Sequence, residues 1–391
     1  MTNDNSEIIS FLRFPLTFAV VAIHCMGNIE TQVDWLHLTG IDLYYLLKVA
    51  CSSVLFGVAV PMFFFISGYL FFVNVDRMDK QTYYKKIRRR LHSLLIPYVT
   101  WNLLAIPLIL LSMYGETLTG TRSIDELTDF IHNGRWTHIF WDFTSHPASF
   151  SNIFGWAQLR SHPVLFTLWY VRDLMIMCLL SPLVYWYIRH TGRWGLVALT
   201  AVFALRIWPY ISVHSVSLFF VFGAYWALNR MPLAVTDRRF RLLIYLLALV
   251  LGMLQVRLLD NYSYWGSQTN PLFLLVACLA VFCLADSFLR HHRGFKLPAL
   301  LGDSSFFIYA LHAVFGLPLG FFLTKAIFKG ATHPLLLSLQ YVVTACMVYL
   351  ICLATYFCLS KIWPKALLLL NGNRGSQVKF KNSSSKNHHH D

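Results

Sequence analysis

The chain has 391 residues, of which 57% are hydrophobic and only 13% are charged, and its mean hydropathy is +0.55. This composition excludes a water-soluble enzyme, a disordered chain and a disulfide scaffold as descriptions of the whole protein. The net charge of +14 does not indicate a nucleic-acid partner, because Lys and Arg fall between apolar segments, where they contact the cytoplasmic membrane face. The composition therefore predicts an integral protein of the lipid bilayer.

Ten apolar runs are long enough to cross a bilayer, whose core of about 30 Å needs about 20 residues per helix. They lie near 8–27, 49–73, 91–114, 164–188, 194–211, 213–229, 242–259, 270–289, 303–324 and 334–360. These runs predict an all-α, polytopic membrane helix bundle of about ten transmembrane helices. The fifth and sixth runs are separated only by a Trp208-Pro209 corner, so a re-entrant pair or one kinked helix stays open there.

The basic residues of the loops orient this bundle. With the N-terminus inside, the inner segments hold about three times as many Lys and Arg as the outer ones, which predicts that both termini are cytoplasmic. Residues 1–370 form the membrane domain, and the long outer loop 115–163, rich in aromatic residues, is expected to be an ordered lid. The polar segment 371–391 is expected to be a disordered cytoplasmic tail. No metal site is predicted, because the eight cysteines show no Cys-x-x-Cys spacing.

Ionisable residues inside the first run are the strongest functional signal, because each is costly in a bilayer and usually faces a cavity or a partner. Arg13 and His24 are eleven residues apart, so they share one helix face and differ by about 16 Å in depth. This pair fits a polar conduit through the bundle. The alternative is that Arg13 anchors the helix at the inner interface and that His24 is an interfacial residue.

The second run and the loop that follows it carry two further patterns. Ser67 and Gly68 allow another helix to approach closely, and the serine can form a hydrogen bond across that contact. The loop contains a cluster of basic residues, Lys86, Arg88, Arg89 and Arg90. The cluster is either a topology anchor or a clamp for phosphate groups, which guanidinium groups bind bidentately.

Polar residues also occur in the fourth and ninth runs. Trp169, Arg172 and Asp173 lie in the fourth run, and because adjacent residues point about 100° apart on a helix, Arg172 and Asp173 are expected to pair with other partners. In the ninth run, Asp303 or Ser304 is expected to be the N-cap. Ser305, Tyr309 and His312 follow i, i+4, i+7 spacing and share a face that can line a polar cavity.

Taken together, these motifs resemble the acyltransferase family 3 membrane proteins, bacterial ten-helix enzymes that acylate cell-envelope carbohydrates. The resemblance covers residues 8 to about 360. It is carried by Arg13-x10-His24, Phe63-Phe64-x-x-Ser67-Gly68, the basic loop before Ile96-Pro97-Tyr98, Leu168-Trp169-Tyr170 and Ser305-x-x-x-Tyr309-x-x-His312. One departure concerns the Arg-x-x-Arg motif that the family often has before its proline, since the nearest fits here are Lys86 with Arg89 and Arg89 with His92.

The resemblance implies transfer of an acyl group, usually acetyl, to a sugar hydroxyl of an envelope glycan or glycolipid at the bacterial cytoplasmic (inner) membrane. The donor would be cytoplasmic acyl-coenzyme A (acetyl-CoA), a substrate and not a bound cofactor. Its phosphates would be held by Lys86, Arg88, Arg89 and Arg90. His24 would act as general base, with or without a transient acyl-enzyme, and Ser67, Tyr309 or Arg172 would stabilise the oxyanion.

A second hypothesis from another functional class stays open at this point. A multi-pass transporter or flippase would use Arg13, His24, Arg172 and Asp173 as a polar pathway. The two hypotheses differ in one observable, because only the enzyme consumes a thioester.

Overall fold

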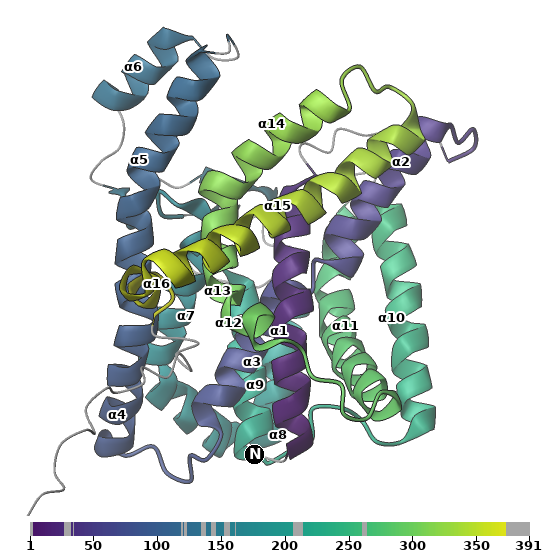
Figure 1. Cartoon of the computed structure of the whole chain (residues 1–391). Coiled ribbons are helices and arrows are strands. Elements are labelled where there is room, and N and C mark those ends of the chain that lie inside the picture. Colours follow the sequence, from purple (N-terminus) through teal and green to yellow (C-terminus); the bar gives the residue numbers. More distant parts are fainter. Residues whose placement is uncertain are drawn as a thin grey trace, which may run out of the picture.

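The computed structural model describes residues 3–26, 33, 35–118, 120, 123–133, 138–141, 146–151, 157–160, 162–205, 214–259 and 264–372. Most of these residues are helical (Figure 1). The helices are α1 (Asn3–His24), α2 (Gly40–Val49), α3 (Ala59–Phe72), α4 (Lys80–Arg90), α5 (Ile96–Leu118), α6 (Ile124–Asn133), α7 (Trp169–Leu179), α8 (Ser181–Ala204), α9 (Phe219–Leu228), α10 (Arg238–Leu259), α11 (Tyr264–His291), α12 (Ala299–Asp303), α13 (Ser305–Leu311), α14 (Leu317–Ile327), α15 (Pro334–Ile362) and α16 (Pro364–Leu370). Short 3₁₀ turns precede α7 and α9, at Phe166–Leu168 and Ser215–Leu218, and π-helical turns occur at Ala50–Leu55, Leu91–Leu95 and His312–Gly316.

Helices long and apolar enough to span a membrane account for most of the bundle. Within the described part of the chain seven qualify, and they are Asp4–His24, Gly40–Phe72, Lys80–Leu118, Arg238–Arg257, Asn270–His291, Ser305–Ile327 and Pro334–Ile362. The pair Phe166–Leu179 and Ser181–Ala204, bent by 62°, counts as one further span, and Ser215–Leu228 is a shorter apolar helix. The polytopic helix bundle is thereby confirmed, whereas the number of ten crossings and the side of the termini stay predictions.

The positions at which the helices bend differ in part from those expected from the sequence. The helical segment from Phe166 to Ala204 breaks at Leu180, inside the predicted fourth run. A second turn lies at Gly192, where φ is +53°, a conformation that glycine adopts without steric cost. Gly192 lies between the fourth and fifth predicted runs. The Trp208-Pro209 corner lies outside the described residues.

Helix α1 occupies the centre of the bundle, and α3, α11, α13 and α15 pack against it (Figure 1). Its buried face includes Leu12, Leu16 and Val20. The peripheral helices expose apolar side chains instead. On α10, for example, the side chains of Leu242, Leu246, Val250 and Met253 are all more than half exposed. Such a surface fits contact with lipid chains.

Two glycines allow the closest helix contact in the bundle, the crossing of α3 and α9. A Cβ atom added at Gly68 would lie 2.0 Å from the carbonyl oxygen of Phe220, and one added at Gly223 would lie 1.9 Å from that of Phe65. The expected close approach at Gly68 is therefore confirmed. This contact fixes the position of Ser67, the residue before Gly68.

The predicted outer loop contains ordered elements. Helix α5 extends to Leu118, α6 follows it, and strands β1 (His146–Ser151) and β2 (Ala157–Arg160) form an antiparallel pair. This hairpin is an addition to the otherwise helical architecture. In Figure 1, α6 lies at the end of the bundle opposite the N-terminus. Residues 373–391, the bulk of the predicted tail, are outside the described part of the chain.

Candidate active site

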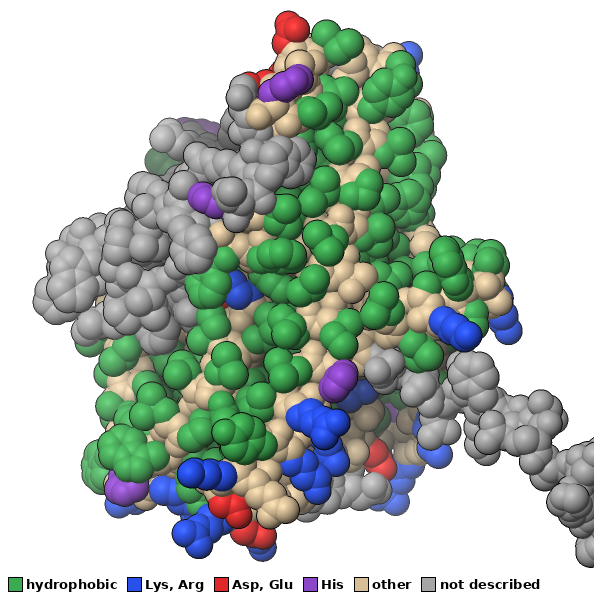
Figure 2. All heavy atoms as spheres, turned by 90° about the vertical axis from the view of Figure 1, so that its left-hand side faces the viewer, with side chains coloured by type: hydrophobic (Ala, Val, Ile, Leu, Met, Phe, Trp, Pro, Cys, Tyr) green, Lys and Arg blue, Asp and Glu red, His purple; other side chains and the backbone are tan. Residues whose placement is uncertain are grey.

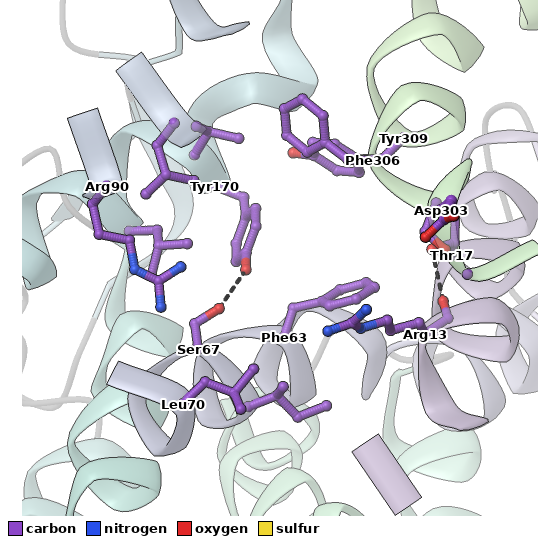
Figure 3. A pocket seen from close by; sticks show the side chains of 16 residues that line it. Arg13, Thr17, Phe63, Ser67, Leu70, Arg90, Tyr170, Asp303, Phe306 and Tyr309 are labelled. Atoms are coloured by element: carbon purple, nitrogen blue, oxygen red, sulfur yellow. Dashed lines mark hydrogen bonds between the residues drawn. The ribbon is translucent and has the colours of Figure 1, made fainter. Parts of the chain in front are cut away.

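A cavity of about 280 Å³ lies between α1, α3, α7 and the α12–α13 segment. Figure 3 shows its side chains, with Arg13 and Arg90 approaching from opposite sides, Ser67 and Phe63 from α3, and Phe306 and Tyr309 from α13. The remaining lining residues are Thr17, Ile66, Leu70, Leu94, Tyr170, Val171, Leu174, Gly302, Asp303 and Ser305. The cavity thus brings together predicted site residues from three separate runs and from the basic loop, namely Arg13, Ser67, Arg90, Ser305 and Tyr309.

Hydroxyl groups line the wall of this cavity. The Ser67 and Tyr170 oxygens are 3.2 Å apart and share a hydrogen bond (Figure 3). The Tyr309 hydroxyl donates to the carbonyl oxygen of Thr167, and the Ser305 hydroxyl donates to that of Leu301 at 2.9 Å. Ser305 and Tyr309 donate to the backbone, whereas in the Ser67–Tyr170 pair one hydroxyl donates to the other, so one hydroxyl hydrogen of the pair is not used within it.

Two guanidinium groups supply the positive charge of the cavity. Neither Arg13 nor Arg90 forms an ion pair or a side-chain hydrogen bond with any described residue, although the Arg90 guanidinium lies 5.8 Å from the centre of the Phe71 ring. An arginine keeps its charge under all physiological conditions. These two cations outnumber the one carboxylate among the lining residues, that of Asp303, so the cavity favours an anionic ligand.

His24 is the last residue of α1 and lies beyond the residues that line the cavity. Its ring packs against the rings of Phe166 and His312, with centroid distances of 5.2 and 5.3 Å. The His312 ring is in turn 6.1 Å from the ring of Tyr309, which belongs to the cavity wall. His24 and the cavity are therefore connected through His312 and Tyr309.

Two buried polar atoms close to His24 have no hydrogen-bond partner among the described residues. They are Nε2 of His312, a residue with no exposed surface, and Oγ1 of Thr167, the residue after Phe166. Nδ1 of His312 lies 2.7 Å from the carbonyl oxygen of Tyr309. Since a carbonyl only accepts, Nδ1 carries the proton and Nε2 is an acceptor. Unsatisfied buried groups are rare and often mark a place for a ligand or water.

The predicted pairing of Arg172 and Asp173 with separate partners is wrong. Arg172 donates from Nε and Nη2 to Oδ1 of Asp173 at 2.9 and 2.8 Å, and both residues are buried. The long Arg side chain bridges the 100° between neighbouring positions, because an unpaired charge in a dry interior costs far more than a bent rotamer. Asp173 does gain a second partner, His214, whose backbone N and Nδ1 lie 2.8 and 3.0 Å from Oδ2.

This Arg172–Asp173–His214 cluster adjoins an indole ring. The rings of Trp169 and His214 are 3.9 Å apart, so Trp169 covers the histidine. The Arg172 guanidinium lies 4.7 Å from the centre of the Trp141 ring, in the outer loop. Arg172 is therefore held away from the central cavity and is not placed to assist there.

The four basic residues of α4 that were selected from the sequence have different surroundings. Arg90 lines the central cavity, whereas Lys86 donates to the carbonyl oxygen of Phe71 at the end of α3. Arg88 and Arg89, with Lys85, line an open hollow on the outside of α4. Figure 2 shows such basic side chains gathered below a broad apolar surface. A shared role of these residues in phosphate binding stays a prediction.

Two further expectations concern the start of the ninth run. Ser304 does occupy the N-cap position of α13, but it has helical dihedral angles and makes no side-chain capping hydrogen bond, and Asp303 ends α12 instead of capping α13. Ser305 and Tyr309 do face the cavity, but His312 faces His24 instead. A π-helical turn begins at His312 and alters the i, i+4, i+7 alignment at that residue.

Three functional candidates were not selected from the sequence: Tyr170, Asp303 and His214. Tyr170 lies next to a selected tryptophan, and its hydroxyl becomes informative only when it is seen beside Ser67. His214 begins a helical segment without any motif around it. Its proximity to Asp173, 41 positions earlier, has no local sequence signal.

Comparison with known proteins identifies the family. A family model described as an acyltransferase domain, that of acyltransferase family 3, matches residues 7–357. No curated protein and no solved structure matched the chain. The match includes all or most of each candidate membrane span and every residue of the central cavity. The chain therefore belongs to acyltransferase family 3 and is a multi-pass membrane acyltransferase.

Proposed function

We propose that this acyltransferase moves an acetyl group from cytoplasmic acetyl-coenzyme A to a hydroxyl group of a cell-envelope saccharide, at the bacterial inner membrane. The observation that carries the proposal is the central cavity, which is lined by a pair of hydroxyls and by two guanidinium groups that have no ion pair with a described residue. An anionic thioester donor needs cations for its phosphates and hydrogen-bond donors near its carbonyl.

The donor occupies the cavity with its pantetheine arm directed from Arg13 toward the outer end of α1. Eleven residues of helix separate Arg13 from His24, a rise of about 16 Å, which suits the length of that arm. Arg13 binds the donor. We count it as a catalytic residue because it contacts the reacting substrate. Arg90 adds a second positive charge at the opposite wall.

His24 is the general base of the reaction. Its imidazole takes the proton of the acceptor hydroxyl while the hydroxyl oxygen attacks the thioester carbonyl carbon. The tetrahedral intermediate collapses, the carbon–sulfur bond breaks, and the coenzyme A thiolate takes the proton from the imidazolium. The products are the acetyl ester and the free thiol, and His24 is regenerated.

His312 and the cavity hydroxyls assist this step. Nε2 of His312 can accept a hydrogen bond from a ring N–H group of His24. The other ring nitrogen of His24 is then the base. His312 is therefore a positioning residue. The Ser67–Tyr170 pair on the cavity wall, in which one hydroxyl donates to the other, has one hydroxyl to donate to the carbonyl oxygen as it gains negative charge.

The acceptor saccharide approaches from the outer side, beside Trp169 and His214. The exposed fraction of the His214 side chain is 26%, and Trp169 offers a flat apolar face of the kind that packs against sugar rings. Asp173 fixes the orientation of His214 through two hydrogen bonds. This outer cluster thus contributes an aromatic face and an imidazole for a polar ligand.

The release of free thiol from acetyl-coenzyme A by the purified protein in detergent tests the proposal. We expect turnover by the wild type and a loss of roughly a hundredfold or more in His24→Ala, since a general base contributes that much. His190→Ala is the matched control, because this exposed histidine on α8 forms a hydrogen bond with the Trp186 carbonyl and packs on the Trp186 ring, both within its own helix. Absence of thiol release, or His24→Ala turning over like His190→Ala, would overturn the proposal, and a change in solute movement would then favour transport.

A further inference from the structure

A second cavity adjoins the central one at Arg13. It encloses about 400 Å³ between the first turns of α1, the end of α11 and the segment 292–298 that leads to α12. Arg13, Gly302 and Asp303 line both cavities. The two cavities are therefore adjacent at these three residues, which places a second ligand compartment beside the central one. Each volume is in the range typical of small-molecule sites or close to it.

The walls of this second cavity are aromatic and basic. Phe11, His292 and Phe295 contribute rings, and Phe11 and Phe295 are 6.2 Å apart in an edge-to-face arrangement. Phe288 supports this wall from behind, because its ring stacks on Phe11 at 5.1 Å and contacts His292 at 4.4 Å. Such a set of rings is suited to a planar, apolar heterocycle.

Charged groups complete the cavity. Lys296 lies on the wall contributed by the 292–298 segment and has no ion pair or hydrogen bond with a described residue. Glu7 and Asp303 provide carboxylates, which accept hydrogen bonds from amino and hydroxyl groups. From the second cavity to the central one, a ligand would therefore contact first the cation of Lys296, then the cation of Arg13 and finally the hydroxyl pair of Ser67 and Tyr170.

We propose that the second cavity binds the adenosine 3′-phosphate end of the coenzyme A donor, with the pyrophosphate at Arg13 and the 3′-phosphate at Lys296. This inference rests on the proposed function. The adenine packs among Phe11, His292 and Phe295, and the pantetheine arm passes Arg13 into the central cavity. The order of rings and charges in the two cavities matches the order of groups in this donor.

The basic outer face of α4 fits the nucleotide less well. Arg88 and Arg89 line an open hollow that includes no residue of the central cavity, so a nucleotide there would have no enclosed path to it. The hollow is formed by one helix face and lacks opposing walls. In contrast, the second cavity shares Arg13, Gly302 and Asp303 with the central cavity and so lies directly beside it.

Binding affinities of the full-length protein in detergent for coenzyme A and 3′-dephospho-coenzyme A test the inference. In the wild type, coenzyme A should bind about tenfold more tightly than the dephospho form, because a charge-assisted hydrogen bond to phosphate is lost in the latter. Lys296→Ala should lose about tenfold in affinity for coenzyme A and nothing for dephospho-coenzyme A. Lys80→Ala removes the same charge from the exposed start of α4 and should change neither affinity.

A second variant fills the cavity without removing a charge. Ser10 lies on its wall, and Ser10→Trp should abolish the use of acetyl-coenzyme A while preserving the use of S-acetylpantetheine, which lacks the nucleotide. The inference fails alone if the wild type binds coenzyme A but Lys296→Ala behaves like Lys80→Ala, or if the combined Arg88→Ala and Arg89→Ala variant is the one that loses discrimination. Absence of any coenzyme A binding by the wild type would instead refute the proposed function, and the inference with it.

Discussion

Replacement of Gly68 by alanine is the most direct test of how the site is positioned. The added Cβ would lie 2.0 Å from the Phe220 carbonyl oxygen and 2.8 and 2.9 Å from the carbonyl carbon and Cα of that residue. Ordinary van der Waals contact begins near 3.4 Å. The two helices must therefore separate by about 1.4 Å at this point, since backbone atoms on both sides cannot rotate away.

The size of the effect follows from the length of the contact. A gap of about 0.5–1 Å already forfeits a quarter to a half of the dispersion energy between facing atoms. At this crossing the buried side chains of Phe65, Phe72 and Phe220 would all lose contact. We expect a destabilisation of about 3 kcal/mol or more, the upper end for overpacking in a dense core.

Thermal melting in detergent measures this loss, and the chain offers a matched control. Gly115 lies within α5, where an added Cβ would meet no atom within 4 Å, so Gly115→Ala should be neutral or stabilising by up to about 1 kcal/mol. Gly68→Ala should also lower turnover, because it moves Ser67 away from Tyr170. If the free energies of unfolding of the two variants lie within about 1 kcal/mol of each other, the reasoning is refuted.

Three further predictions concern the buried ion pair, the second histidine and the start of α4. Asp173→Asn should destabilise the protein by about 3–5 kcal/mol, because it leaves the buried Arg172 charge without its counterion, and a melting point close to that of the wild type would contradict this. His312→Ala should lower kcat at least tenfold with little change in the KM for acetyl-coenzyme A, and His312→Gln, which retains an acceptor, should recover part of the rate; equal losses in both variants would argue against a positioning role. Asp79 is the N-cap of α4, and its carboxylate accepts a hydrogen bond from the Thr82 N–H at 2.8 Å, which holds the pKa of this carboxyl below its usual value. This capping hydrogen bond is therefore fully formed above the usual pKa and is lost as the pH falls through the lowered pKa. Hydrogen exchange at Thr82, corrected for its intrinsic rate, should therefore accelerate below about pH 4, and in Asp79→Ala it should be fast at every pH.

Much of the architecture follows from hydropathy and helix geometry alone. Where the structure describes them, the apolar runs are largely helical, because a segment without polar side chains must satisfy its backbone internally in lipid. The close approach at Gly68 is readable because only glycine leaves space for a neighbouring carbonyl. The shared face of Arg13 and His24 is likewise a consequence of 3.6 residues per turn.

Other features depend on tertiary contacts and leave no local signal. The Arg172–Asp173 pair reflects side-chain flexibility and the penalty for an unpaired buried charge, which outweigh the direction of the Cα–Cβ bonds. The turn of His312 toward His24 results from a π-helical segment that regular helix geometry does not anticipate. His214 is 41 positions from Asp173 in the sequence, and only the tertiary fold brings the two side chains together. The second cavity could not be anticipated either, because its walls come from segments nearly 300 residues apart, such as Phe11 and Phe295.

Transfer of radiolabelled acetyl groups into envelope saccharides tests the central claim most directly. Membranes from cells that produce the wild-type protein would be given acetyl-coenzyme A labelled in its acetyl group, beside membranes with His24→Ala and His190→Ala. We predict that label enters the glycan or glycolipid fraction with the wild type and His190→Ala and is lost in His24→Ala. Equal labelling with His24→Ala, or none with the wild type above membranes that lack the protein, would contradict the account of His24 as the base of an acetyl transfer.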